Sequence, residues 1–132
     1  MKLVLTQRSN ALETLHLFRH ASDTFSLSAG EYLFHQGDAA ELMYILVEGE
    51  VDILVGDTIV DSVGPETVLG EMAMIDAEPR SASVRAKTAC RVVPIDRKRF
   101  QFLIQQTPYF AIEVMRILAH RLRKMDIWLF SK

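Results

Sequence analysis

The chain has 132 residues, a formal net charge of −2 and a hydrophobic fraction of 49%. This length fits one domain, residues 1–132, and is sufficient to bury a core without disulfides or metals. The small net charge gives no general attraction to nucleic acid or anionic lipid. The sequence has one cysteine and no apolar run long enough to cross a bilayer, so we expect a cytoplasmic protein without membrane insertion.

The first predicted element is a helix. Asn10 to Glu13 has the pattern of a capping box, in which two side chains satisfy backbone N–H groups at a helix start. Leu12, Leu15 and Phe18 follow at helical spacing. The sequence therefore predicts an N-terminal helix that places one apolar face on the domain.

From Asp23 the pattern changes to short segments rich in apolar or β-branched residues, separated by turn residues. The predicted strands are 24–27, 31–34, 42–47, 51–55, 58–63, 83–86 and 90–96. Gly56-Asp57 lies between two of them and predicts a two-residue hairpin loop. Many short strands at regular spacing are typical of a sandwich or a barrel.

Helices return after the last strand. Asp96 is a candidate cap for a helix over 97–105, and Thr107-Pro108 predicts the start of a second one. In the second helix, apolar residues step by four and three over nearly three heptads: Ala111, Met115, Leu118, Leu122, Met125 and Leu129. One face must cover the domain, and the remaining apolar face suits a partner helix. We therefore expect a homodimer through this helix, although the whole stripe could instead pack within one subunit.

The segment 69–84 reads Leu-Gly-Glu-Met-Ala-Met-Ile-Asp-Ala-Glu-Pro-Arg-Ser-Ala-Ser-Val. Gly70 allows a ligand to approach the backbone closely, and N–H groups at a helix start attract anions. The Arg80 guanidinium can bind two phosphate oxygens in a fork. Glu71 can only accept hydrogen bonds, which suits a hydroxyl partner. The segment is thus suited to hold a sugar hydroxyl and a phosphate together, the alternative being a surface turn with an incidental arginine.

This segment resembles the phosphate-binding cassette of cyclic nucleotide-binding domains, through Gly70, Glu71, Ala73 and the run from Pro79 to Val84. The continuation over 84–90 resembles the bacterial catabolite-activator branch of that family, and the resemblance covers about residues 12–125. It implies a mainly β fold with flanking helices (α+β). The expected architecture is a jelly-roll β-roll over about 23–96, an N-terminal helix, a short cassette helix and C-terminal helices over about 97–130.

The resemblance also implies roles for individual residues. Arg80 would neutralise the cyclic phosphate, and Ser81 and Ala82 would donate hydrogen bonds to it. Glu71 would accept a hydrogen bond from the ribose 2′-OH, and Gly70 would let the sugar approach. Apolar walls would come from Leu69, Met72, Val84, Ile53 and Val63.

The C-terminal helix would lie over the purine. Arg121 or Arg123 could reach the phosphate or Glu71 from this helix, or both could be solvated. Met125 is expected to form an apolar cover over the base. Asp126 could accept from the adenine amino group or from the N1–H and N2–H groups of guanine.

The sequence thus predicts a receptor that prefers cyclic AMP modestly over cyclic GMP and relays binding through the C-terminal helix to an unidentified protein partner. The alternative is a regulatory domain of a larger channel, kinase or transporter assembly. The chain stops at Lys132, where family members that regulate transcription continue into a DNA-binding module, so we expect no DNA binding.

We expect no enzyme activity, cofactor or metal, because no nucleophile and base pair is evident. The histidines lie on separate predicted elements without metal-ligand spacing: His16, His20, His35 and His120.

Overall fold

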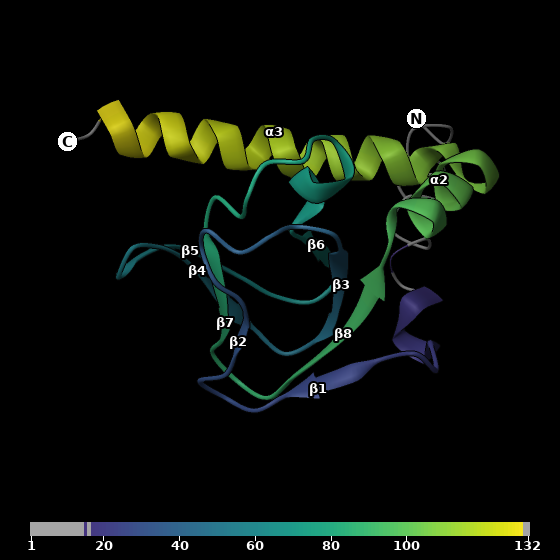
Figure 1. Ribbon diagram of the computed structural model, residues 1–132, viewed down its shortest axis with the longest axis horizontal. Helices are drawn as coiled ribbons and strands as arrows, with labels where there is room; N and C mark the ends of the chain where they lie inside the picture. The colour runs from purple at the N-terminus through teal and green to yellow at the C-terminus, as the bar shows by residue number, and fades with distance from the viewer. Residues whose placement is uncertain (1–14, 16, 131–132) are drawn as a thin grey trace, which may run out of the picture.

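The computed structural model describes residues 15 and 17–130, with side chains described as far as residue 124. Two four-stranded antiparallel sheets form a β-roll, and a long helix runs across one end of it (Figure 1). The first sheet has the order β1 (Phe25–Leu27), β8 (Cys90–Ile95), β3 (Met43–Glu48), β6 (Thr67–Leu69). The second has the order β2 (Tyr32–Phe34), β7 (Ser83–Ala86), β4 (Val51–Val55), β5 (Thr58–Val63).

The predicted mainly β fold is confirmed, and the predicted strands agree with the observed ones to within two residues at each end. The Gly56-Asp57 loop joins β4 to β5, with Val55 paired to Thr58 and Gly56 at φ +60°. One strand was missed. β6 is only three residues long and follows Glu66, which adopts a left-handed φ of +64°.

Two strands at the centre of the first sheet separate two apolar clusters. Neighbouring residues of a strand point to opposite faces of the sheet. Ile45 of β3 therefore joins the cluster beneath the helices, which includes Phe110. The next residue, Leu46, joins the cluster between the two sheets, which includes Val51 of β4. Burial on both faces explains why β3 reads as a continuous apolar run.

The described part of the N-terminal region is short. Leu15 and Leu17 are helical, and the 3₁₀ helix η1 (Phe18–His20) follows. Leu15 is 1% exposed and Phe18 is 8% exposed, and both pack in the cluster beneath the helices. The predicted capping box at 10–13 lies outside the described residues.

The C-terminal helices begin where the sequence predicts. The Asp96 side chain accepts from the Arg99 backbone N–H at 2.7 Å and caps α2 (Arg97–Gln106). α3 (Pro108–Phe130) starts with proline at its first position. Arg97 donates to the Ala73 carbonyl at 2.9 Å, which ties α2 to the 3₁₀ helix η2 (Glu71–Met74). No helix in the described residues is long and apolar enough to span a membrane.

The apolar stripe of α3 divides between two environments. Leu118 is partly buried against the core, whereas Met115 is 58% exposed and Leu122 is 65% exposed. Ile112, at 38% exposure, adds to the exposed side. The helix therefore covers the roll with one face and leaves a second apolar face uncovered.

Candidate functional site

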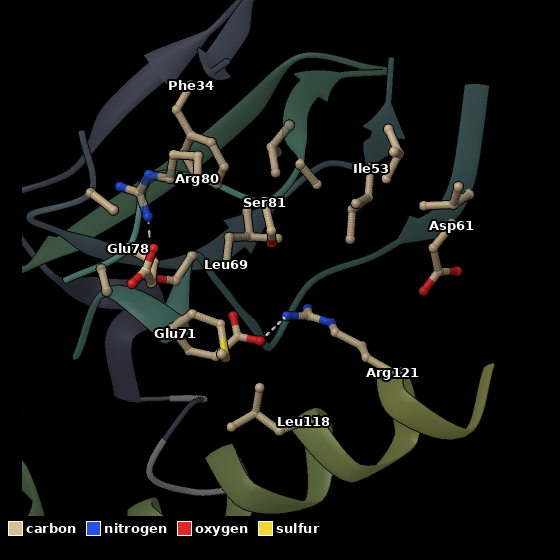
Figure 2. A pocket seen from close by; sticks show the side chains of 18 of the residues that line it. Phe34, Ile53, Asp61, Leu69, Glu71, Glu78, Arg80, Ser81, Leu118 and Arg121 are labelled. Carbon is tan, nitrogen blue, oxygen red and sulfur yellow. Dashed lines mark hydrogen bonds and ion pairs between the residues drawn. The ribbon is translucent and has the colours of Figure 1, made fainter. Parts of the chain in front are cut away.

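A cavity of about 350 Å³ lies between the segment 69–84, the sheet that contains β4 and β5, and α3 (Figure 2). Ten of the predicted site residues line it: Ile53, Leu69, Gly70, Glu71, Met72, Arg80, Ser81, Ala82, Val84 and Arg121. The remaining lining residues come from several elements: Phe34, Ala40, Val55, Val60, Asp61, Ala73, Glu78, Pro79, Leu118, Leu122 and Lys124. The fold thus assembles one site from strands, cassette and helix.

Gly70 makes room for the arginine at the floor of this cavity. It has a left-handed φ of +69° and immediately precedes η2. A Cβ at this position would collide with the Arg80 guanidinium. Both its conformation and its lack of a side chain are therefore required, because other residues rarely adopt this φ.

Arg80 is a buried cation with an incomplete set of partners. Its side chain donates to the Leu42 carbonyl at 2.7 Å and to the Gly70 carbonyl at 3.2 Å. The guanidinium carbon lies 4.0 Å from the centre of the Phe34 ring. Only 8% of the residue is exposed, and its buried Nε has no hydrogen-bond partner in the described structure.

The electrostatics of this arginine favour an anionic ligand. Burial lowers the pKa of Arg80, and the nearby charges of Tyr44, Asp38 and Glu71 oppose that shift. No carboxylate of the described residues forms an ion pair with it. A buried charge without a counter-ion is unfavourable. Arg80 would therefore offer an anion in the cavity both an opposite charge and N–H donors for hydrogen bonds.

Glu71 and Arg121 form an ion pair beside this anion site. Glu71 is 4% exposed, and its Oε1 accepts from Arg121 Nη1 at 2.6 Å. Arg121 also donates to the Val68 carbonyl at 2.6 Å and to Thr67 Oγ1 at 3.4 Å. Of the alternatives for Arg121, contact with Glu71 is the one observed. Glu71 keeps a second oxygen that can accept from a hydroxyl group.

A second ion pair lies at the opposite side of the cavity from Arg80 (Figure 2). Asp61 Oδ1 accepts from Lys124 Nζ at 3.0 Å and from the Ser62 backbone N–H at 2.9 Å. The sequence interpretation missed both residues of the pair. Asp61 lies in a predicted strand and Lys124 in a predicted helix, and no local pattern indicates that they meet.

Two predicted site residues need separate comment. Val63 is not among the residues that line the cavity: it packs at the end of β5 against the cluster between the sheets, so its assignment as a wall stays a prediction. The side chain of Met125 lies outside the described side chains, as does that of Asp126. Within residues 15 and 17–130, no group of histidine, cysteine or acidic side chains is placed to hold a metal ion.

A β-roll that encloses a buried arginine and a buried glutamate under a long helix is the arrangement of a cyclic nucleotide-binding domain. The family model for the cyclic nucleotide-binding domain matches residues 24–107. The chain belongs to this family.

Its relatives are regulatory proteins. The cAMP-activated global transcriptional regulator CRP of Salmonella typhimurium is 37% identical over 97 residues, which are 69% of this chain and 46% of that protein. A cAMP-dependent protein kinase regulatory subunit of Emericella nidulans is 37% identical over 86 residues, which are 64% of this chain and 21% of that protein. The match thus spans about half the length of the first relative and about a fifth of the second.

Solved structures show the same fold. The catabolite activator protein of Thermus thermophilus matches with a TM-score of 0.71 and 26% identity, over 96% of this chain and 58% of that one. A cyclic nucleotide-binding domain from Methylobacillus flagellatus matches with a TM-score of 0.68 and 26% identity, over 83% of this chain and 67% of that one.

Proposed function

We propose that this domain binds cyclic AMP in preference to cyclic GMP and relays binding through α3 to a protein partner. The observation that carries the proposal is the state of Arg80: 8% exposed, without a carboxylate partner among the described residues, and with an unpartnered Nε. A cyclic phosphate carries one negative charge and several acceptor oxygens. It would complete the hydrogen bonding of Arg80, and Ser81 and Ala82 beside it would donate to the same group.

The sugar would lie against Glu71. The free oxygen of this carboxylate can accept from the ribose 2′-OH while the other oxygen stays paired with Arg121. The base would then extend from the cassette toward β4, β5 and α3, where Ile53, Val60 and Leu118 line the cavity. Apolar walls bury a purine without reading its edge, so they discriminate weakly between adenine and guanine.

The names of two relatives favour cyclic AMP. The bacterial and fungal relatives are named for activation by, or dependence on, cyclic AMP. The exposed apolar face of α3 provides the output in this proposal, because a nucleotide that binds one arrangement of α3 better than another shifts the population of that helix. The net charge of −2 gives no attraction to duplex DNA, so we expect a protein to read the signal.

Two versions of this function differ in which protein responds to the nucleotide-bound domain. In the first, the domain acts on a separate protein or on a second copy of itself. In the second, it is a regulatory domain within a larger channel, kinase or transporter assembly, which the kinase regulatory subunit among its relatives favours. In both versions its role is regulatory and not catalytic.

Calorimetric titration with cyclic AMP and cyclic GMP in parallel tests the proposal, with 5′-AMP as a control for an open phosphate. We expect cyclic AMP to bind more tightly than cyclic GMP, within about a hundredfold, because one or two hydrogen bonds set the difference. Recovery of cyclic AMP unchanged after the titration checks that the domain does not hydrolyse it. Absence of binding by either cyclic nucleotide would refute the proposal.

A further inference from the structure

The cavity contains one polar pair that the phosphate and sugar do not explain. Most lining residues on the side away from Arg80 are apolar. The exceptions are Arg121, which is paired with Glu71, and the pair of Asp61 of β5 and Lys124 of α3. In Figure 2 Asp61 lies across the cavity from Arg80, with Ser81 and Leu69 between them. A nucleotide with its phosphate at Arg80 would extend its base in this direction.

The contacts of Asp61 leave one oxygen available. Both of its hydrogen bonds with described residues, from Lys124 Nζ at 3.0 Å and from the Ser62 N–H at 2.9 Å, use Oδ1. These two hydrogen bonds hold the Asp61 side chain in place. The side chain is 16% exposed and so is partly shielded from water. Lys124 is 49% exposed and has further N–H donors besides the one given to Asp61.

We propose that Asp61, oriented by Lys124, reads the purine by accepting a hydrogen bond from the amino group at C6 of adenine. This inference rests on the proposed binding of a cyclic nucleotide. A carboxylate accepts only, and an amino group on the adenine ring donates only. The neighbouring ring nitrogen, N1, is an acceptor and matches the Lys124 ammonium. The amino group and N1 of adenine thus face groups of opposite hydrogen-bonding character, the Asp61 carboxylate and the Lys124 ammonium.

The same pair disfavours guanine in that orientation. Guanine carries a carbonyl oxygen at C6, which would face the Asp61 oxygen as one acceptor against another. Specificity often depends on such a repulsive contact with the wrong ligand as well as on an attractive one with the right ligand. Asp61 therefore supplies base discrimination that the apolar walls lack.

The test compares cyclic AMP with the cyclic phosphate of purine riboside, which has hydrogen in place of the amino group at C6. Wild type should bind cyclic AMP about tenfold to a hundredfold more tightly than this analogue, the effect of one hydrogen bond to a charged group. Asp61→Ala should bind the two ligands within about threefold of each other, with little change for the analogue. Asp57→Ala, an exposed aspartate in the β4–β5 loop outside the cavity lining, should keep the wild-type ratio.

Two more variants separate base reading from a structural role. Asp61→Asn has the same shape and should lower the ratio while retaining the wild-type melting temperature. Lys124→Met keeps the aliphatic stem and should retain most of the preference for cyclic AMP over the analogue that lacks the amino group. If Asp61 only fixes α3 through Lys124, then Asp61→Ala and Lys124→Met will weaken both ligands equally, which would overturn the inference.

Wild-type binding also decides between the two proposals. Equal affinity for cyclic AMP and the analogue would overturn the reading of the base by Asp61 and leave the proposed function in place. Absence of binding by any cyclic nucleotide would overturn the proposed function and the inference with it.

Discussion

Arg121 on α3 and Glu71 in the cassette are joined by a hydrogen-bonded ion pair of 2.6 Å. The two residues are 50 positions apart, and the same arginine donates to the Val68 carbonyl in the middle of β6. One side chain therefore connects the long helix to the strand before the cassette and to the carboxylate expected to hold the ribose. Any displacement of α3 must alter the surroundings of Glu71, which gives a physical route from ligand to helix.

The first prediction concerns this connection. Arg121→Met should lower the free energy of unfolding by about 1–3 kcal/mol, because it leaves the buried Glu71 without its charged partner. It should also weaken cyclic AMP binding several-fold, since Glu71 is no longer held in one orientation. Urea unfolding and calorimetry measure the two effects. Arg123→Met, two residues along α3 and exposed, is the matched control and should change neither.

The second prediction concerns the anion site. Arg80→Ala should weaken cyclic AMP binding by at least about tenfold to a hundredfold, because no other buried cation in the described cavity offsets the phosphate charge. Arg80→Lys keeps the charge but loses the fork of donors, so its affinity should lie between those of wild type and the alanine variant.

The control for the anion site is Arg116→Ala, which removes an arginine with a 60% exposed side chain from α3. Circular dichroism should give the same spectrum for all four proteins. Arg80→Ala that retains wild-type affinity would contradict the assignment of Arg80 to the phosphate.

The third prediction concerns the sugar. Wild type should bind cyclic AMP more tightly than its 2′-deoxy analogue, and Glu71→Ala should narrow that difference. Arg121→Met breaks the same ion pair but keeps the carboxylate, so it should narrow the difference less than Glu71→Ala does. If Glu71→Ala discriminates as well as wild type does, another residue binds the 2′-OH.

Sequence reasoning succeeded where the signal is local. The Gly56-Asp57 loop and the Asp96 cap depend on a few neighbouring residues, and both are observed as predicted. Gly70 and Arg80 belong to the one segment that resembles a phosphate-binding cassette, and the structure places them in contact. β6 was missed although it is as long as β1 and β2, which were predicted; its last residue, Leu69, was interpreted as the start of the cassette segment.

The sequence interpretation did not predict contacts between elements that are far apart in the sequence. Asp61 and Lys124 are 63 residues apart, and their pairing depends on how α3 crosses the roll. Val63 was assigned to the cavity from its strand, but the cavity meets β5 at Val60 and Asp61, nearer the middle of that strand. Strand membership alone does not determine which residues along a strand face a ligand.

The fourth prediction concerns Cys90, which is 4% exposed. Burial raises the pKa of this thiol, and hydrogen bonds involving Thr88 and Glu50 oppose the shift. The thiolate is the reactive form, so native protein should react with iodoacetamide at neutral pH at least about tenfold more slowly than protein in urea.

The pKa shift also has a consequence for stability. A thiol whose pKa is raised in the folded state stabilises the fold below its ordinary pKa of 9.0, and this contribution is lost as the pH rises through the folded value. The urea concentration at the unfolding midpoint should therefore decrease as the pH is raised above 9, and it should decrease less in Cys90→Ala. Tyr44, whose pKa burial also raises, would add to the loss only at higher pH. An alkaline loss equal in both proteins would exclude Cys90 as its cause.

The last prediction concerns self-association through α3. Ile112, Met115 and Leu122 are spaced by three and seven residues, so they form one exposed apolar stripe, with exposures of 38%, 58% and 65%. Exposed apolar stripes of this kind suit a partner helix. Wild type should dimerise at micromolar concentration in sedimentation velocity, and Met115→Glu should shift it toward monomer because it places two like charges across the seam. His120→Glu, an exposed residue off the stripe, should leave the dimer intact.

The same helix should respond to nucleotide. Leu122 both belongs to the exposed stripe and lines the cavity, so a ligand that moves it changes the surface offered to the partner. Cyclic AMP should therefore shift the dimerisation constant of wild type, in the direction fixed by which form binds it better. Reciprocity requires dimer and monomer to differ in affinity for cyclic AMP, and with one site in each protomer the dimerisation constant at saturation changes by the square of that affinity ratio. A wild-type protein that stays monomeric with and without cyclic AMP would contradict self-association through this stripe.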